Sequence, residues 1–218
     1  MNQSDPTPQK TPDSGEGNRS RDRAATEKRI LDAAQKVLTE TGASGLGVNA
    51  LARAAGVDKQ LIYRYYGGLD GVLQALGERI ALWWQDRLLD DPPISPPATY
   101  AALIERLALR LLHVLRTEPL AAQSGLWELA DTSGLVGPLT ASRARALGEW
   151  MARTRGSLQP PEGVDAPAVN AILVSAISYM VLASRTSPTV VGLPLDGEAG
   201  WARVEAATRR LVRGVYGA

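Results

Sequence analysis

Hydrophobic side chains recur three and four residues apart along nearly the whole of this chain of 218 residues. This spacing is typical of helices that bury one side. No stretch alternates apolar and polar residues in the way that an exposed strand would, so we expect little or no sheet. The pattern predicts an all-α fold of about nine helices. We expect them at residues 26–41, 48–54, 59–66, 70–89, 99–117, 118–131, 135–155, 168–185 and 200–215.

Prolines and polar residues divide the chain into three parts. The first eighteen residues hold three prolines and no aliphatic side chain beyond Met1, so we expect a disordered tail over residues 1–20. No apolar stretch follows a basic start, which argues against a signal peptide and for the cytoplasm. Residues 90–97 hold four prolines and predict a connector. An N-terminal domain of residues 24–84 and a helical body of residues 85–218 are expected around it.

A short region of the N-terminal domain predicts two helices joined by a tight turn. Residues 48–54 can form two helical turns, and Gly56 suits a turn because glycine accepts positive φ without strain. Asp58 can then cap the next helix, residues 59–66, by accepting hydrogen bonds from its free N–H groups. This arrangement is a helix-turn-helix.

The second of these two helices has a polar face. At 100° per residue, Lys59, Gln60, Tyr63 and Arg64 lie opposite the apolar side. Two cations, an amide and a phenol are groups that pair with phosphates and with base edges in the major groove of DNA. The alternative is a solvated helix that is basic by chance.

Three spaced motifs in this part of the chain resemble the TetR family of bacterial regulators. RILDAAQKVLTETG (residues 29–42) is similar to the family's first helix, and LARAAGV (residues 51–57) to its second helix and turn. LIYRYYGGLDGVLQAL (residues 61–76) is similar to the end of the recognition helix and the start of the fourth helix. The match runs without a gap over residues 24–84.

The resemblance implies a DNA-binding N-terminal domain and a helical domain for ligand binding and dimerisation. It implies a homodimer that binds double-stranded DNA at a near-palindromic operator and releases it when a small-molecule inducer binds, which favours a repressor over an activator. Six positions match those through which the family contacts DNA. They are Asn49, which stands where a base is often contacted, Lys59, Gln60, Tyr63 and Arg64 at groove-facing positions, and Tyr65 at a phosphate-contacting position.

Some positions depart from the family pattern. Gly47 stands where the family usually has Thr, and Leu69 stands where it usually has a phosphate-contacting Lys. Leu38 and Tyr66 replace the usual Phe, which this chain lacks altogether. The change at Leu69 puts one phosphate contact per subunit in doubt and would flatten the salt dependence of DNA binding.

The body contains a run of nineteen residues without a charge, residues 166–184. A membrane span is one interpretation, but a proline and several polar residues interrupt the run. A helix buried on two sides is simpler, with one side on its own core and the other on a second subunit. Together with the last helix it predicts a dimer interface. The expected interface residues are Ile172, Ile177, Trp201, Val204 and Leu211.

Aromatic residues of the body are candidates for an inducer pocket among the middle helices, where the family's ligands bind. The candidates are Trp84, Trp127, Trp150 and Tyr179. The alternative is that each is an ordinary core residue. His113 is the single histidine and falls in a polar arc of its helix, so we expect a surface position rather than a pocket group or a pH sensor.

Composition bears on the remaining function classes. The absence of Cys and the single His exclude thiol nucleophiles and Cys-ligated zinc, and they argue against an enzyme, a metal site or a cofactor. The net charge of +1 by itself argues mildly against a nucleic-acid partner. Residues 19–64, however, carry nine cations and five anions. An interaction protein that has the same fold but binds DNA weakly or not at all is the main alternative function.

Overall fold

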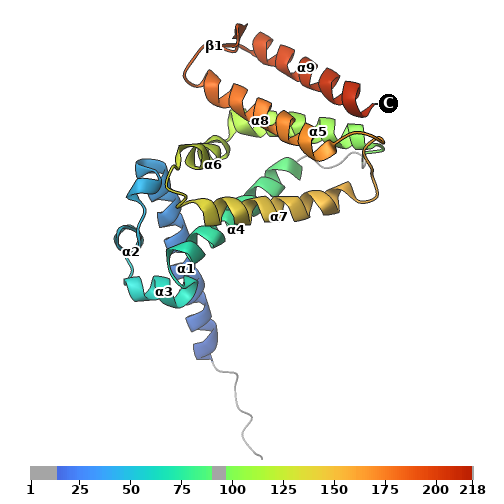
Figure 1. Ribbon diagram of the computed structural model, residues 1–218. Coiled ribbons are helices and arrows are strands. Elements are labelled where there is room, and N and C mark those ends of the chain that lie inside the picture. Colours follow the sequence, from blue (N-terminus) through green and yellow to red (C-terminus); the bar gives the residue numbers. More distant parts are fainter. Residues whose placement is uncertain (1–13, 90–96, 218) are drawn as a thin grey trace, which may run out of the picture.

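A computed structural model describes residues 14–89 and 97–217. Within these ranges the chain forms nine α-helices, one short 3-10 helix and one two-stranded hairpin (Figure 1). The all-α prediction is therefore confirmed. The helices are α1 (Ser14–Thr41), η1 (Ala43–Gly45), α2 (Val48–Ala55), α3 (Lys59–Tyr66), α4 (Leu69–Leu89), α5 (Tyr100–Thr117), α6 (Pro119–Ala130), α7 (Gly137–Arg155), α8 (Ala166–Ser184) and α9 (Glu198–Tyr216).

The first helix starts earlier than expected. α1 begins at Ser14, so residues 14–20, which we expected in a disordered tail, are helical. Our expectation considered only burial, whereas an established helix can be extended by further residues at little cost. The rest of the expected tail, and all but the last residue of the proline-rich connector, lie outside the described residues.

The hairpin occupies the break before the last helix. β1 (Thr189–Val190) and β2 (Leu193–Pro194) pair antiparallel, with Val190 opposite Leu193. The turn between them has positive φ at Val191 (49°) and Gly192 (77°). Two residues per strand are too few for alternation to be visible in the sequence.

The helices form a small N-terminal head and a larger body. α1, α2 and α3 make up the head at one end, and α5, α8 and α9 lie together at the other, with α4 and α7 between them (Figure 1). In the head, Ile30, Leu51 and Ile62 are fully buried, one from each helix. The apolar stripes that define these helices in the sequence therefore meet in one core.

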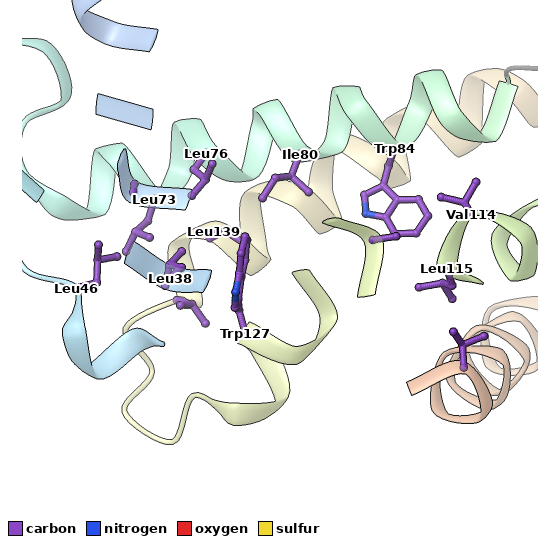
Figure 2. Close-up of a cluster of buried hydrophobic side chains, with 14 of the residues drawn as sticks. Leu38, Leu46, Leu73, Leu76, Ile80, Trp84, Val114, Leu115, Trp127 and Leu139 are labelled. Atoms are coloured by element: carbon purple, nitrogen blue, oxygen red, sulfur yellow. The ribbon is translucent and has the colours of Figure 1, made fainter. Parts of the chain in front are cut away.

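α4 and α7 pack against each other more closely than side chains would normally allow. A Cβ atom added to Gly77 of α4 would come within 2.4 Å of the backbone oxygen of Leu139 of α7. Around this point Leu76 and Ile80 of α4 are buried, and Figure 2 shows them in one cluster with Leu139 and with Trp127 of α6. The absence of a side chain at Gly77 lets the two backbones meet.

The core continues from the head into the body without a gap. Leu38 of α1 and Leu46, which follows η1, belong to the same cluster of buried side chains as Trp127 (Figure 2). Val204 of α9 is part of this cluster too. The head is thus part of the same packed structure as the body and does not hang from α4 alone.

Replacing Gly77 by Ala should destabilise the protein because the α4 and α7 backbones would have to separate. We expect a loss of about 1–3 kcal/mol in the free energy of unfolding, measured by urea denaturation. Gly148 of α7 offers a matched control, since an added Cβ there meets no other described atom within 4 Å. Gly148→Ala should instead raise the stability by roughly 0.5–1 kcal/mol. Equal effects of the two changes would contradict the role given to Gly77.

Candidate nucleic-acid interface

The predicted turn between α2 and α3 is present. Gly56 adopts the left-handed conformation, with φ 62° and ψ 41°, and ends α2. Asp58 then caps α3, its Oδ1 accepting a hydrogen bond from the backbone N–H of Gln60 at 2.7 Å. Both features follow from local chemistry, and together they fix the angle at which α3 leaves α2.

The polar face of α3 is exposed as predicted. Lys59, Gln60, Tyr63 and Arg64 are all exposed, whereas Ile62 on the opposite side is fully buried. The side chains on this face are therefore available to a partner outside the chain.

Three of the six predicted contact residues line one hollow of about 480 Å³ between the start of α2 and α3. They are Asn49, Lys59 and Tyr63, and Arg53 joins them there. Arg53 was not among the predicted residues. Its position four residues after Asn49, on the same side of α2, was a signal that could have identified it. The hollow is thus flanked by two cations, an amide and a phenol.

Of the other predicted contact residues, Gln60 lies in the first turn of α3, and Arg64 and Tyr65 lie at its end. A terminal nitrogen of Arg64 donates a hydrogen bond to the Tyr65 hydroxyl at 2.9 Å, and the guanidinium carbon of Arg64 lies 4.9 Å from the centre of the Tyr65 ring. The guanidinium carbon of Arg23 on α1 lies 5.2 Å from the same ring. No pattern in the sequence indicates this contact, because it joins residues 42 positions apart.

A hydrogen bond from Tyr66 ties α3 to α1. The Tyr66 hydroxyl donates to the backbone carbonyl oxygen of Glu27 at 3.2 Å. Burial, aided by the Glu27 carboxylate, raises the pKa of Tyr66 to about 12. The hydroxyl is what distinguishes Tyr66 from the Phe that the resemblance leads one to expect here.

Two departures from the resembled pattern have visible consequences. Gly47 is the residue before α2 and can offer no side-chain cap to that helix. Leu69 is partly buried and packs against the core, so the first residue of α4 contributes to stability and not to the charged surface. Asp70, next to it, is exposed in the first turn, where the helix dipole favours an anion.

The four candidate pocket residues differ in exposure. Trp84, Trp127 and Trp150 are buried in the body, each 5–6% exposed, and Trp84 and Trp127 belong to one cluster of buried side chains. The indole N–H of Trp84 finds no hydrogen-bond partner among the described residues. Tyr179 is 62% exposed on α8, so it lines no pocket within the chain as described.

A groove of about 790 Å³ opens elsewhere in the body. It runs along α5 between α9 and the ends of α4 and α7. Its walls include Arg106, His113 and Arg209, together with apolar residues such as Leu103 and Leu107. His113 is exposed there, as its polar arc predicts. Two arginines of α9 join this helix to α5 along the groove, since Glu105 pairs with Arg213 at 2.7 Å and with Arg209 at 3.0 Å. The hydrogen bonds from Arg213 and from Arg209 hold the pKa of the Glu105 carboxyl below its usual value.

Three of the five expected interface residues turn inward. Ile177, Trp201 and Val204 are 2–7% exposed and belong to the chain's own core, so the prediction that they face a second subunit is wrong. The physical reason is that α8 and α9 each pack one side against the body, and helical periodicity does not tell which side this is. Ile172 and Leu211 are 70% and 63% exposed, as an interface requires.

Most of α8 is not covered by the chain. This helix is long and apolar enough to cross a membrane. Its most apolar stretch of 18 residues has a mean hydropathy of 1.8, and only 17% of that stretch is buried. Ile172 and Tyr179, seven residues apart, lie exposed on one side of it. Its other side is anchored, because Asn170 donates to the Tyr100 hydroxyl and accepts from the Tyr216 hydroxyl, both at 3.0 Å.

Among the described residues, no three His, Cys, Asp or Glu side chains gather as metal ligands would.

Comparison with known proteins agrees with this architecture. Residues 30–76 match the family model described as bacterial regulatory proteins, tetR family. The chain is 27% identical over 203 residues to an HTH-type transcriptional repressor of Streptomyces coelicolor, covering 88% of this chain and 98% of that protein.

Solved structures share the fold at low sequence identity. A TetR family transcription regulator from Marinobacter aquaeolei has a TM-score of 0.58 and 17% identity, covering 90% of this chain and 98% of that one. The transcriptional regulator FadR from Bacillus subtilis, solved in complex with stearoyl-CoA, has a TM-score of 0.55 and 18% identity, covering 88% and 98%.

The raised pKa of Tyr66 predicts a loss of stability in alkali. Between pH 10 and 12 the Tyr66 phenol ionises in the unfolded chain before it does so in the folded one, so the free energy of unfolding should fall as the pH rises through this range. Tyr66→Phe should be less stable than wild type at pH 8, by about 1 kcal/mol for the missing hydrogen bond. The difference in the free energy of unfolding between Tyr66→Phe and wild type should shrink towards pH 11.5.

Urea denaturation followed by tryptophan fluorescence at several pH values measures this difference. Tyr63→Phe, which changes an exposed phenol on the same helix, is the control and should track wild type. A deficit of Tyr66→Phe that stays constant with pH would argue against the buried phenol.

Proposed function

We propose that the chain is a ligand-responsive, DNA-binding transcriptional regulator, because residues 30–76 match the model of the tetR family of bacterial regulatory proteins. The observation that carries this proposal is the exposed face of α3, which presents Lys59, Gln60, Tyr63 and Arg64 outward from a helix-turn-helix. A helix of this kind enters the major groove, where amide and cationic side chains contact base edges. Asn49 and Arg53 on α2 lie beside it.

We assign the chain the role of a repressor that leaves its operator when a small molecule binds the body. The S. coelicolor relative that covers most of the chain is named a repressor, which supports repression over activation. The groove along α5, of about 790 Å³, is within the size range of small-molecule sites. FadR of B. subtilis, which shares the fold, was solved with stearoyl-CoA, so this fold accommodates a ligand. We place such a regulator in the cytoplasm, where its DNA lies.

We further propose that a second copy of the chain covers α8 and α9. The side of α8 that carries Ile172 and Tyr179 is apolar and exposed, and Leu211 extends the same character onto α9. A two-fold dimer would present two copies of α3, and its operator would be near-palindromic. The hydrogen bonds of Asn170 to two tyrosines favour this arrangement over a membrane span, because they fix the inner side of α8 to the body.

Removing the cations of α3 should weaken operator binding. Lys59→Ala and Arg64→Ala should each cost about 1–3 kcal/mol, which is roughly a tenfold to hundredfold rise in Kd. An operator selected from random duplexes by the wild-type protein, followed by fluorescence anisotropy, provides the measurement. Lys36→Ala is the matched control, since Lys36 is an exposed cation of the head that lies outside α3. Unchanged binding by both α3 variants would contradict the assignment of this face.

A charge placed on the exposed side of α8 should dissociate the dimer. Wild type should sediment at the mass of two chains at micromolar concentration, and Ile172→Glu should sediment as one chain. Leu129→Glu is the control, because Leu129 of α6 is 77% exposed and equally apolar but lies on another helix. A wild-type protein that sediments as a stable monomer would rule out the dimer.

A further inference from the structure

The last turn of α3 holds a cluster of side chains that the helix itself does not require. Two guanidinium groups from different helices lie over one phenol, Arg23 from α1 and Arg64 from α3, both within about 5 Å of the Tyr65 ring. Tyr65 itself is partly buried against the core, so the ring is a fixed platform. Cations contacting an aromatic face gain about 0.5–1 kcal/mol each at exposed sites.

A guanidinium that contacts an aromatic ring can still pair with an anion. Within the chain, that role falls to Glu27, whose Oε1 accepts a hydrogen bond from Nε of Arg23 at 2.7 Å. This pair lies on the surface, where the side chain of Arg23 is 62% exposed, so it contributes little to stability. A guanidinium has five N–H donors, and a group engaged through Nε still presents its planar terminal nitrogens to solvent.

The location of Arg23 relative to α3 suits a contact with the DNA backbone. A recognition helix inserted in the major groove has base edges along its length and backbone phosphates at its flanks. Arg23 does not lie on α3. It lies on α1, beside the last turn of α3, and α1 extends past α3 away from the body (Figure 1).

We propose that Arg23, held with Arg64 on the ring of Tyr65, binds a phosphate of the DNA backbone, and that Glu27 occupies Arg23 until the phosphate displaces it. This inference rests on the proposed DNA-binding function. In this proposal Arg23 is a phosphate-binding cation of the head. Leu69 stands where the resembled family has a phosphate-contacting Lys, so α4 does not offer one at that position. It also gives Glu27 an inhibitory role, because its carboxylate competes with the phosphate for the same guanidinium.

Opposite effects of the two members of the ion pair form the test. Arg23→Gln should raise the Kd for the selected operator on the order of tenfold and flatten the salt dependence, by a slope of about 0.9 for each phosphate that the protein no longer neutralises. Glu27→Gln should lower the Kd and steepen that dependence. Arg23→Lys should bind more tightly than Arg23→Gln because it retains the cation.

Lys36 and Glu40 form a second pair at the same spacing on α1, thirteen residues further along, and provide matched controls. Lys36→Gln and Glu40→Gln should leave the slope of log Kd against log salt unchanged. Circular dichroism checks that each variant keeps its helix content.

A merely structural role for the Arg23 and Glu27 pair would move both variants in the same direction, since each breaks the same ion pair. Weaker binding by Glu27→Gln, or an unchanged Kd and salt slope for Arg23→Gln, would overturn the inference. Binding of the operator by wild type would still support the proposed function. Failure of wild type to select any operator would contradict the proposed function itself.

Discussion

The close contact of α4 with α7 at Gly77 is the constraint on which the relative placement of the other helices depends. α4 begins against α1 and α3 and ends against α5, so its two ends belong to different halves of the molecule. A helix of this length, about 30 Å, would transmit little movement from the body to the head if it were held only at its ends. Packing against α7 along its length holds α4 in place. The close approach of the two backbones at Gly77 determines where α4 and α7 cross.

Local features of the fold could be predicted from the sequence because their causes are local. Gly56 adopts positive φ and Asp58 caps α3, each for reasons contained within a few residues. Leu51 and Ile62 are buried where the helical period places them. The start of α1 at Ser14 was missed because residues 14–20 hold no aliphatic or aromatic side chain that could form an apolar stripe in the sequence.

Features that depend on which elements meet could not be predicted in the same way. The period of α9 identified Trp201 and Val204 as one apolar side, but could not say that this side faces the chain's own core. The contact of Arg23 with Tyr65 joins two helices and likewise has no signature in either. The total charge is a similar case, since the excess of cations over residues 19–64 is hidden in a sum of +1.

The continuous core has a consequence for how a signal could cross the molecule. Leu38 and Leu46 of the head are packed in the same cluster as Trp127 of the body, so within the described residues the two halves share one core. A ligand can therefore shift the head only by favouring one complete packing of this core over another, and its effect is bounded by the free-energy difference between them. Substitutions inside the cluster would then alter that difference without touching DNA or ligand. Such substitutions would include both a class of variants that never releases DNA and a class that never holds it.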